Sequence, residues 1–126
     1  MASTLVPLLR EPDRPALDAL LAPAVQFHSP FADYAGHDDV SHLISTIATV
    51  VHDVEPTRVL EDDGGRTTFI DGRVDDRALQ GVLDERYDDA GQLVEATLFI
   101  RPYATLRVAM AHMGAALEAD PLPSKR

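Results

Sequence analysis

Two neighbouring carboxylates, Asp84 and Glu85, lie in a stretch whose pattern predicts a β-strand over residues 78–88. Successive side chains of a strand point to opposite faces, so one of the two faces inward if the other side is solvent or a partner surface. A carboxylate among apolar side chains has a raised pKa unless it is paired, which makes it a candidate acid or base. The alternative is a carboxylate at an open rim that is hydrated or paired with an arginine.

The histidines and Ser29 offer less chemistry. Asp38 and His42 are four residues apart on a predicted helix, but two ligands on an exposed face are weak evidence for a metal, and we expect His42 on the polar side of that helix. Ser29 lacks the glycines of a nucleophile elbow, so we interpret it as a pocket-lining or turn hydroxyl. The sequence therefore predicts no metal site, and we expect no cofactor.

The elements that position these groups follow from periodicity and from breaking residues. We expect helices over residues 4–10, 14–22, 40–52 and 102–118, strands over 24–29, 54–62, 66–75, 78–88 and 93–100, and a loop over 31–36. The last strand places Val94, Ala96, Leu98 and Ile100 on one face. Consecutive strands with short turns pair antiparallel, so the chain predicts an α+β domain over residues 1–119 with helices on one side of the sheet. Residues 120–126 contain two prolines and are expected to form a flexible tail.

The composition excludes several classes of function. The chain has 126 residues, 45% of them hydrophobic, which is enough for one domain with its own core. Its net charge of −10 disfavours binding to nucleic acid or to an anionic membrane, because phosphate recognition needs clustered Lys and Arg. The absence of cysteine fits a reducing compartment. With no apolar run of membrane-spanning length and no secretory pattern at the N-terminus, we expect a cytoplasmic protein.

Four segments together resemble a known group: FHSPF at 27–31, GHDDV at 36–40, LQGVLDERYDDAGQL at 79–93 and LFIRPY at 98–103. In this order and spacing the chain resembles the SnoaL-like branch of the nuclear-transport-factor-2-like superfamily over residues 5–117. The resemblance implies a curved antiparallel sheet forming a cone-like half-barrel, with helices packed on its concave side, a pocket in its mouth and dimerisation through the sheet. It also implies that Leu83, Glu85 and Tyr87 share the inner face.

The resemblance does not extend to the catalytic groups of the better-known relatives. Steroid isomerases of this superfamily place a base, an oxyanion-binding acid and a tyrosine where this chain has Ser29, Leu83 and Leu5, so we predict that this activity is absent. Epoxide hydrolases use an Arg-x-Asp pair, matched by Arg73 and Asp75, with a second Asp that would fall near Leu98. Polyketide cyclases use inward acids or bases on the late strands, where this chain is apolar.

Two functions remain open from the sequence. The first is a small-molecule-binding domain with an apolar pocket, and we expect it to form a homodimer through the sheet, with Phe99 and Leu93 in the contact. The second is a small cofactor-independent enzyme of cyclase, isomerase or hydrolase type, acting on an apolar substrate with Glu85 as its acid or base. The predicted pocket residues are Phe27, Ser29, Phe31, Tyr34, Ile70, Leu83, Glu85, Ala96, Leu98 and Met110.

Overall fold

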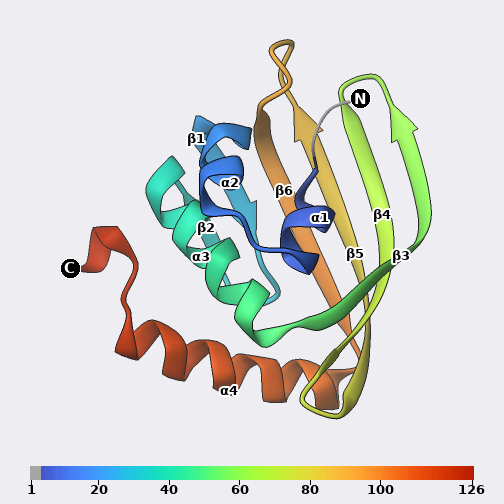
Figure 1. Ribbon diagram of the computed structural model, residues 1–126, viewed down its shortest axis with the longest axis vertical. Coiled ribbons are helices and arrows are strands. Elements are labelled where there is room, and N and C mark those ends of the chain that lie inside the picture. The colour runs from blue at the N-terminus through green and yellow to red at the C-terminus, as the bar shows by residue number, and fades with distance from the viewer. Residues whose placement is uncertain (1–3) are drawn as a thin grey trace.

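The computed structural model describes residues 4–126, and none of the helices in this range is long and apolar enough to cross a membrane. In chain order the elements are α1 (Leu5–Arg10), α2 (Arg14–Leu20), β1 (Leu21–His28), β2 (Asp33–Ala35), α3 (His37–Val50), β3 (His52–Asp62), β4 (Gly65–Val74), β5 (Arg77–Tyr87), β6 (Leu93–Arg101), α4 (Tyr103–Ala119) and the 3₁₀ turn η1 (Pro123–Lys125) (Figure 1). Asp13 caps α2, since its carboxylate accepts a hydrogen bond from the Ala16 amide.

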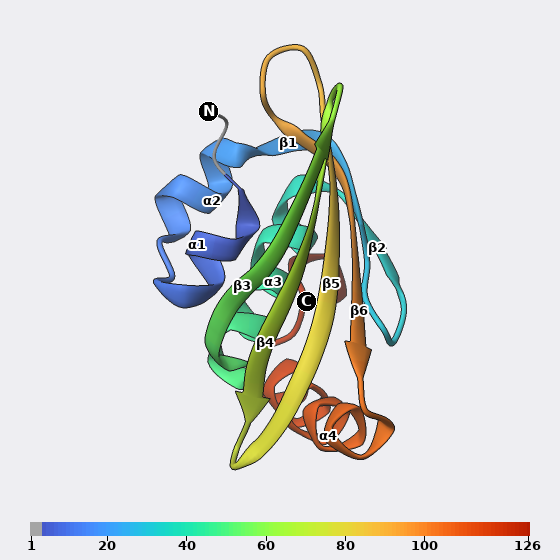
Figure 2. The same ribbon diagram turned by 90° about the vertical axis from the view of Figure 1, so that its right-hand side faces the viewer.

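The six strands form one curved, open sheet in the order β2-β1-β6-β5-β4-β3. The meander from β3 to β6 is antiparallel, as the short turns predict, while β1 pairs parallel to β6. Helices α1, α2 and α3 pack on one side of this sheet, and α4 lies across the end at which β4 and β5 are joined (Figures 1 and 2). The predicted α+β architecture is confirmed.

The core lies between the concave face of the sheet and the helices. The apolar stripe of α3 is buried there: Val40, Leu43, Ile44, Ile47 and the following Val51. Facing it, the sheet contributes Val25, Phe27, Ile70, Val74, Leu79, Leu83, Leu93, Ala96 and Leu98, all buried. The interior is therefore apolar on both sides.

Two differences from the expected elements have local causes. Residues 31–36 are not a plain loop, because Asp33–Ala35 form the edge strand β2 against β1. Gly36 then takes a φ of +97°, a left-handed conformation that side chains with a Cβ rarely adopt, and this turn starts α3 at His37 rather than at residue 40.

A β-bulge corrects the expected facing of the last strand. The register between β5 and β6 shifts next to the Tyr87–Leu93 pair, so Leu93 points inward and is completely buried, while Val94 is only half-buried. Leu93 is therefore not available for contacts on the outer face of the sheet. Strict alternation fails here because the bulge adds one residue to the strand, and it holds again from Ala96 onward.

The C-terminal helix buries other residues than the one that we assigned to the pocket. Thr105, Ala109 and Met113 are its buried residues, and Met110, which we expected to line the pocket, is 44% exposed. Because α4 has small and apolar residues on nearly every side, the spacing of its large residues does not identify the buried face.

The tail after α4 makes contacts with α3. Leu122 is buried, and the Asp39 carboxylate accepts hydrogen bonds from the backbone amide and the hydroxyl of Ser124. His42, expected on the polar side of α3, is buried instead, and its Nε2 donates to the carbonyl of Asp120. The flexibility expected for residues 120–126 stays a prediction.

Candidate functional site

The inner face of the sheet gathers most of the predicted pocket residues. Register pairs place Leu83 opposite Thr68 and Leu98, and Glu85 opposite Arg66 and Ala96, all on the concave side. Phe27, Ile70, Leu83, Ala96 and Leu98 are each no more than 5% exposed. They lie together, but as closely packed side chains under the helices.

A narrow crevice remains at the end of the sheet next to α4. Its volume is ≈ 10 Å³, and it is lined by nine uncharged residues: Pro30, Phe31, Ile47, Val50, Val51, Leu98, Ile100, Ala109 and Met113. Of the predicted pocket residues, Phe31 and Leu98 reach it. Met113 and Ala109 occupy the place that we assigned to Met110. This space is about large enough for a single water molecule.

Glu85 is the one carboxylate buried in the interior of the described chain, with no exposed surface. Its Oε2 accepts hydrogen bonds from the Tyr87 hydroxyl at 2.5 Å and from the Leu5 amide at 2.9 Å, whereas Oε1 has no partner among the described residues. Burial raises the pKa of the carboxyl, and these two hydrogen bonds and the charge of Arg66 partly offset the rise. The alternative of a hydrated rim position is therefore wrong. Glu85 lies deep beneath α1, away from the crevice-lining residues.

Tyr87 and Asp84 complete the surroundings of this carboxyl. Burial and the neighbouring Glu85 carboxylate raise the pKa of the Tyr87 phenol, so Tyr87 acts as a hydrogen-bond donor at neutral pH. Asp84 lies on the opposite face of β5 and accepts a hydrogen bond from the Thr67 hydroxyl at 2.6 Å. The pair of neighbouring carboxylates is thus divided between the two faces, as the strand period predicts.

The two remaining predicted residues, Ser29 and Tyr34, lie in the turn after β1 and on β2 and do not line the crevice. The Ser29 hydroxyl donates to the carbonyl of Ala32 and accepts from the amides of Phe31 and Ala32, each at 3.1 Å, so it organises the turn after β1. Tyr34 lies on β2 opposite Phe27, half-buried against the core. Neither residue has the surroundings of a nucleophile.

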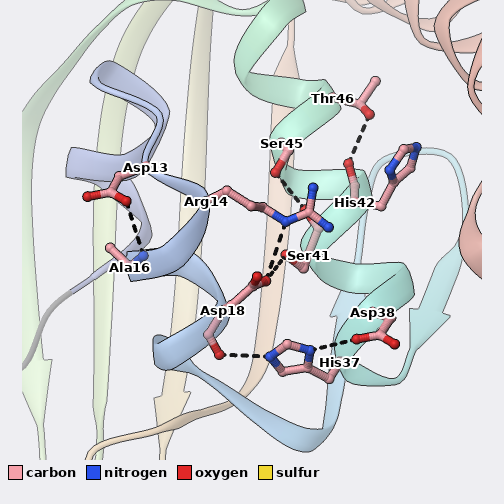
Figure 3. A network of polar contacts seen from close by, with 10 residues as sticks. All are labelled: Asp13, Arg14, Ala16, Asp18, His37, Asp38, Ser41, His42, Ser45 and Thr46. Carbon is pink, nitrogen blue, oxygen red and sulfur yellow. Dashed lines mark hydrogen bonds and ion pairs between the residues drawn. The ribbon is translucent and has the colours of Figure 1, made fainter.

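A polar network joins α2 to α3, and sequence reasoning missed it (Figure 3). Asp18 accepts a hydrogen bond from the fully buried Ser41 hydroxyl and one from Arg14, and the Ser41 bond is the largest cause of its lowered pKa. His37 Nε2 donates to the backbone carbonyl of Asp18 at 2.7 Å, and its Nδ1 lies 3.0 Å from Asp38. The serine contacts the carboxylate and not the imidazole, so the group holds the helices together and has no nucleophilic arrangement. Within residues 4–126 no cluster of His, Asp and Glu is suited to a metal ion.

The outer face of the sheet carries an apolar depression of ≈ 370 Å³. Phe69, Val82 and Phe99 lie in it, and Phe99 is 57% exposed. The guanidinium of Arg58 is 5.6 Å from the ring centre of Phe69, within the range of a cation–π contact. This surface lies on the side of the sheet away from the helices. Its signal in the sequence is an apolar residue at outward-facing positions of three neighbouring strands: Phe69, Val82 and Phe99.

Comparisons with known proteins identify relatives at the level of whole structures. No family model matches the chain, and no curated protein matches it. A crystal structure described as a steroid delta-isomerase from Pseudomonas aeruginosa is 32% identical, with a TM-score of 0.83, and the match covers 90% of this chain and 85% of that one. An uncharacterized protein with a cystatin-like fold from Silicibacter pomeroyi is 20% identical, with a TM-score of 0.87 over 92% of this chain and 84% of that one.

A third structure shares the fold alone. It is a hypothetical protein with a ketosteroid isomerase-like fold from Catenulispora acidiphila in complex with trimethylamine, 10% identical, with a TM-score of 0.66 over 87% of this chain and 95% of that one. At this identity the likeness carries no information about chemistry.

Proposed function

Because this chain belongs to the nuclear-transport-factor-2-like superfamily, we propose that it is a small-molecule-binding domain of the SnoaL-like branch, whose ligand is uncharged and mainly apolar. The observation that supports this most is the crevice between α4 and the end of the sheet, which we call the mouth of the cone, because all nine of its lining residues are uncharged. Apolar lining favours apolar ligands, since each polar group left without a partner there would lose its hydration. A cytoplasmic location stays part of the proposal.

The isomerase activity named for the Pseudomonas relative does not transfer to this chain in our proposal. The positions at which the resemblance implies that enzyme's acid and base hold Leu83 and Ser29, and its tyrosine corresponds to Leu5. Leu5 and Leu83 are buried apolar residues, and the Ser29 hydroxyl is engaged in a turn. A leucine neither abstracts a proton nor donates a hydrogen bond to an oxyanion, so the necessary chemistry is missing.

The test compares two molecules that differ mainly in charge. Decanol and decanoate have the same chain length, and we expect saturable binding of decanol by titration calorimetry with no binding of decanoate. The uncharged lining and the net charge of −10 both disfavour the carboxylate. Equal binding of the two compounds, or binding of decanoate alone, would contradict an uncharged site.

A second candidate function is a cofactor-independent enzyme with Glu85 as acid or base. It is favoured by the buried carboxyl whose Oε1 has no partner and whose neighbour is a phenol. Once a bound compound is known, Glu85→Gln separates the two functions. Loss of turnover with retained binding supports the enzyme, and unchanged behaviour of the compound supports a binding domain.

We also propose that two copies pair through the outer face of the sheet. The apolar depression around Phe69, Val82 and Phe99 supports this, because exposed apolar surface of this kind marks contact sites. Light scattering is expected to give about twice the chain mass of 13.7 kDa. Phe99→Glu should give the monomer mass, while Met110→Glu, which places the same charge on an exposed residue of α4, should leave the dimer intact. A monomeric native chain would refute the pairing.

A further inference from the structure

The C-terminal helix α4 is only lightly attached to the rest of the fold. Of its 17 residues, three are buried: Thr105, Ala109 and Met113. It lies across the end of the sheet (Figure 1). Two of its three buried residues, Ala109 and Met113, line the crevice, so this helix forms one wall of the space.

Polar contacts hold the start and the middle of α4 to the hairpin of β4 and β5. The Thr105 hydroxyl donates to the carbonyl of Ala78 at 2.8 Å, and His112 Nε2 lies 2.8 Å from a carboxylate oxygen of Asp75. Asp75 lies in the turn between β4 and β5, and Ala78 is the second residue of β5. These contacts fix the helix to one side of the mouth.

The tail fixes the other end of α4 to a different element. Asp39, in the first turn of α3, accepts both hydrogen bonds from Ser124, and Leu122 is buried nearby in the same segment. His42 holds the carbonyl of Asp120, directly after the helix, at 2.8 Å. We call these contacts of Asp39 and His42 with residues 120–124 the latch. The helix therefore spans the mouth between the sheet and α3.

We propose that α4 is a cover over the mouth of the cone, closed by the latch, and that an uncharged apolar ligand enters the crevice under Ala109 and Met113 when this cover lifts. This rests on the proposed binding function. A volume of ≈ 10 Å³ admits no ligand, whereas ligand pockets commonly enclose about 300–1,000 Å³. Something that borders the crevice must move, and of the helices and strands that border it, α4 has the fewest buried residues for its length.

The other short helix on this side of the sheet, α1, does not line the crevice, and a larger share of its residues is buried. Half of its six residues are buried, and the Leu5 amide is bonded to the buried carboxylate of Glu85. An ion pair of 3.2 Å between Arg10 and Glu55 joins its last residue to β3. Lifting α1 would expose that carboxylate and three core residues. Lifting α4 exposes two buried apolar side chains and one threonine, together with the partly buried Val108 and Leu117 and, where the latch opens, Leu122.

The absence of cysteine makes single-cysteine labelling a clean test of opening. Ala109→Cys reports on the wall formed by α4, and Ala96→Cys, equally buried on the inner face of β6, reports on opening of the core. We expect a thiol reagent to label Ala109→Cys at least about tenfold faster than Ala96→Cys, because a partial opening precedes global unfolding. Met113→Cys serves as a second reporter on the same wall if Ala109→Cys does not fold.

Two matched variants test the latch. Asp39→Ala removes the hydrogen bonds to Ser124, and Asp38→Ala removes the neighbouring acid of the same first helical turn without touching the tail. Asp39→Ala should speed labelling of Ala109→Cys by about tenfold, as loss of charge-assisted hydrogen bonds predicts, and leave Ala96→Cys unchanged. Asp38→Ala should change neither rate.

The outcomes separate the cover from the binding function. Equal labelling rates at residues 109 and 96, or equal effects of Asp39→Ala and Asp38→Ala, would overturn the cover even if decanol binds. Rapid, latch-dependent labelling together with no binding of decanol would retain the cover and refute the proposed ligand class.

Discussion

Replacing Glu85 with glutamine tests whether the interior excludes water as the structure indicates. Burial raises the pKa of this carboxyl above its ordinary 4.5, so the folded state favours the protonated form. The stability contributed by that proton is fully present below about pH 4.5 and is lost as the pH rises through the folded-state pKa. Over that interval the native protein should lose about 1.4 kcal/mol of stability per pH unit relative to Glu85→Gln.

The size of the effect at low pH follows from the hydrogen bonds. Glutamine keeps an oxygen that accepts from Tyr87 and from the Leu5 amide, but it adds an amide group at the place where Oε1 has no partner. At pH 4 the protonated native carboxyl has one O–H donor, whereas the glutamine amide has two N–H donors. An additional unpartnered buried donor costs about 1–3 kcal/mol, so Glu85→Gln should be the less stable protein at pH 4. As the pH rises, the free energy of unfolding of Glu85→Gln should increase relative to that of the native chain.

Urea unfolding of both proteins at a series of pH values from 4 to 8 measures this difference directly. Asp84→Asn is the matched control, because it removes one carboxylate from the adjacent, outward-facing position of the same strand. Subtracting its effect removes the contribution of net charge. A difference between Glu85→Gln and the native chain that stays constant across this range would refute the assignment of Glu85 to a water-excluded interior.

Further predictions concern two glycines and one histidine. A Cβ at Gly81 would lie 2.9 Å from the backbone oxygen of Phe99, so Gly81→Ala should lower the free energy of unfolding by about 1–3 kcal/mol. Gly114 of α4 has open space around it, so Gly114→Ala should raise the free energy of unfolding by about 0.5–1 kcal/mol. Urea unfolding measures the effect of each substitution, and effects of the same sign would contradict the packing at these two glycines. His28 bridges β2 to β6 through Asp33 at 2.7 Å and Glu95 at 2.8 Å, and these two carboxylates raise its pKa. The stability that these two ion pairs contribute should be fully present below pH 6.5 and be lost as the pH rises through the raised pKa of His28. Hydrogen exchange of residues 33–35 should therefore show protection that falls with rising pH in the native chain and not in His28→Gln.

The sequence was sufficient for the order and type of the main elements because their signals are local. The α3 stripe, the Asp13 cap and the hairpin turns each depend on residues that are close in the chain. The facing of Leu93 could not be predicted in the same way, since it depends on a bulge that only the pairing with β5 creates. The face of α4 likewise depends on which small residues allow close approach, and Ala109 gives no signal in a pattern of large apolar residues.

The candidate site was predicted less well than the fold, for a related reason. Strand alternation put Leu83 and Glu85 on one face of their strand, and the resemblance implied that this face is the inner one, where the structure has both residues buried. Alternation does not reveal how much space remains between packed side chains, and the crevice forms where Phe31 meets α4 far along the chain. The burial of His42 depends on the tail, which meets it from 78 residues away in the sequence.

Methyl NMR during a titration with decanol tests the central claim most directly, because it locates the bound molecule. We predict that the largest shifts occur at Leu98, Ile100 and Met113, around the crevice. Shifts confined to Val59, Leu60 and Val82, whose side chains are at least partly exposed on β3 and the outer face, would contradict binding inside the cone.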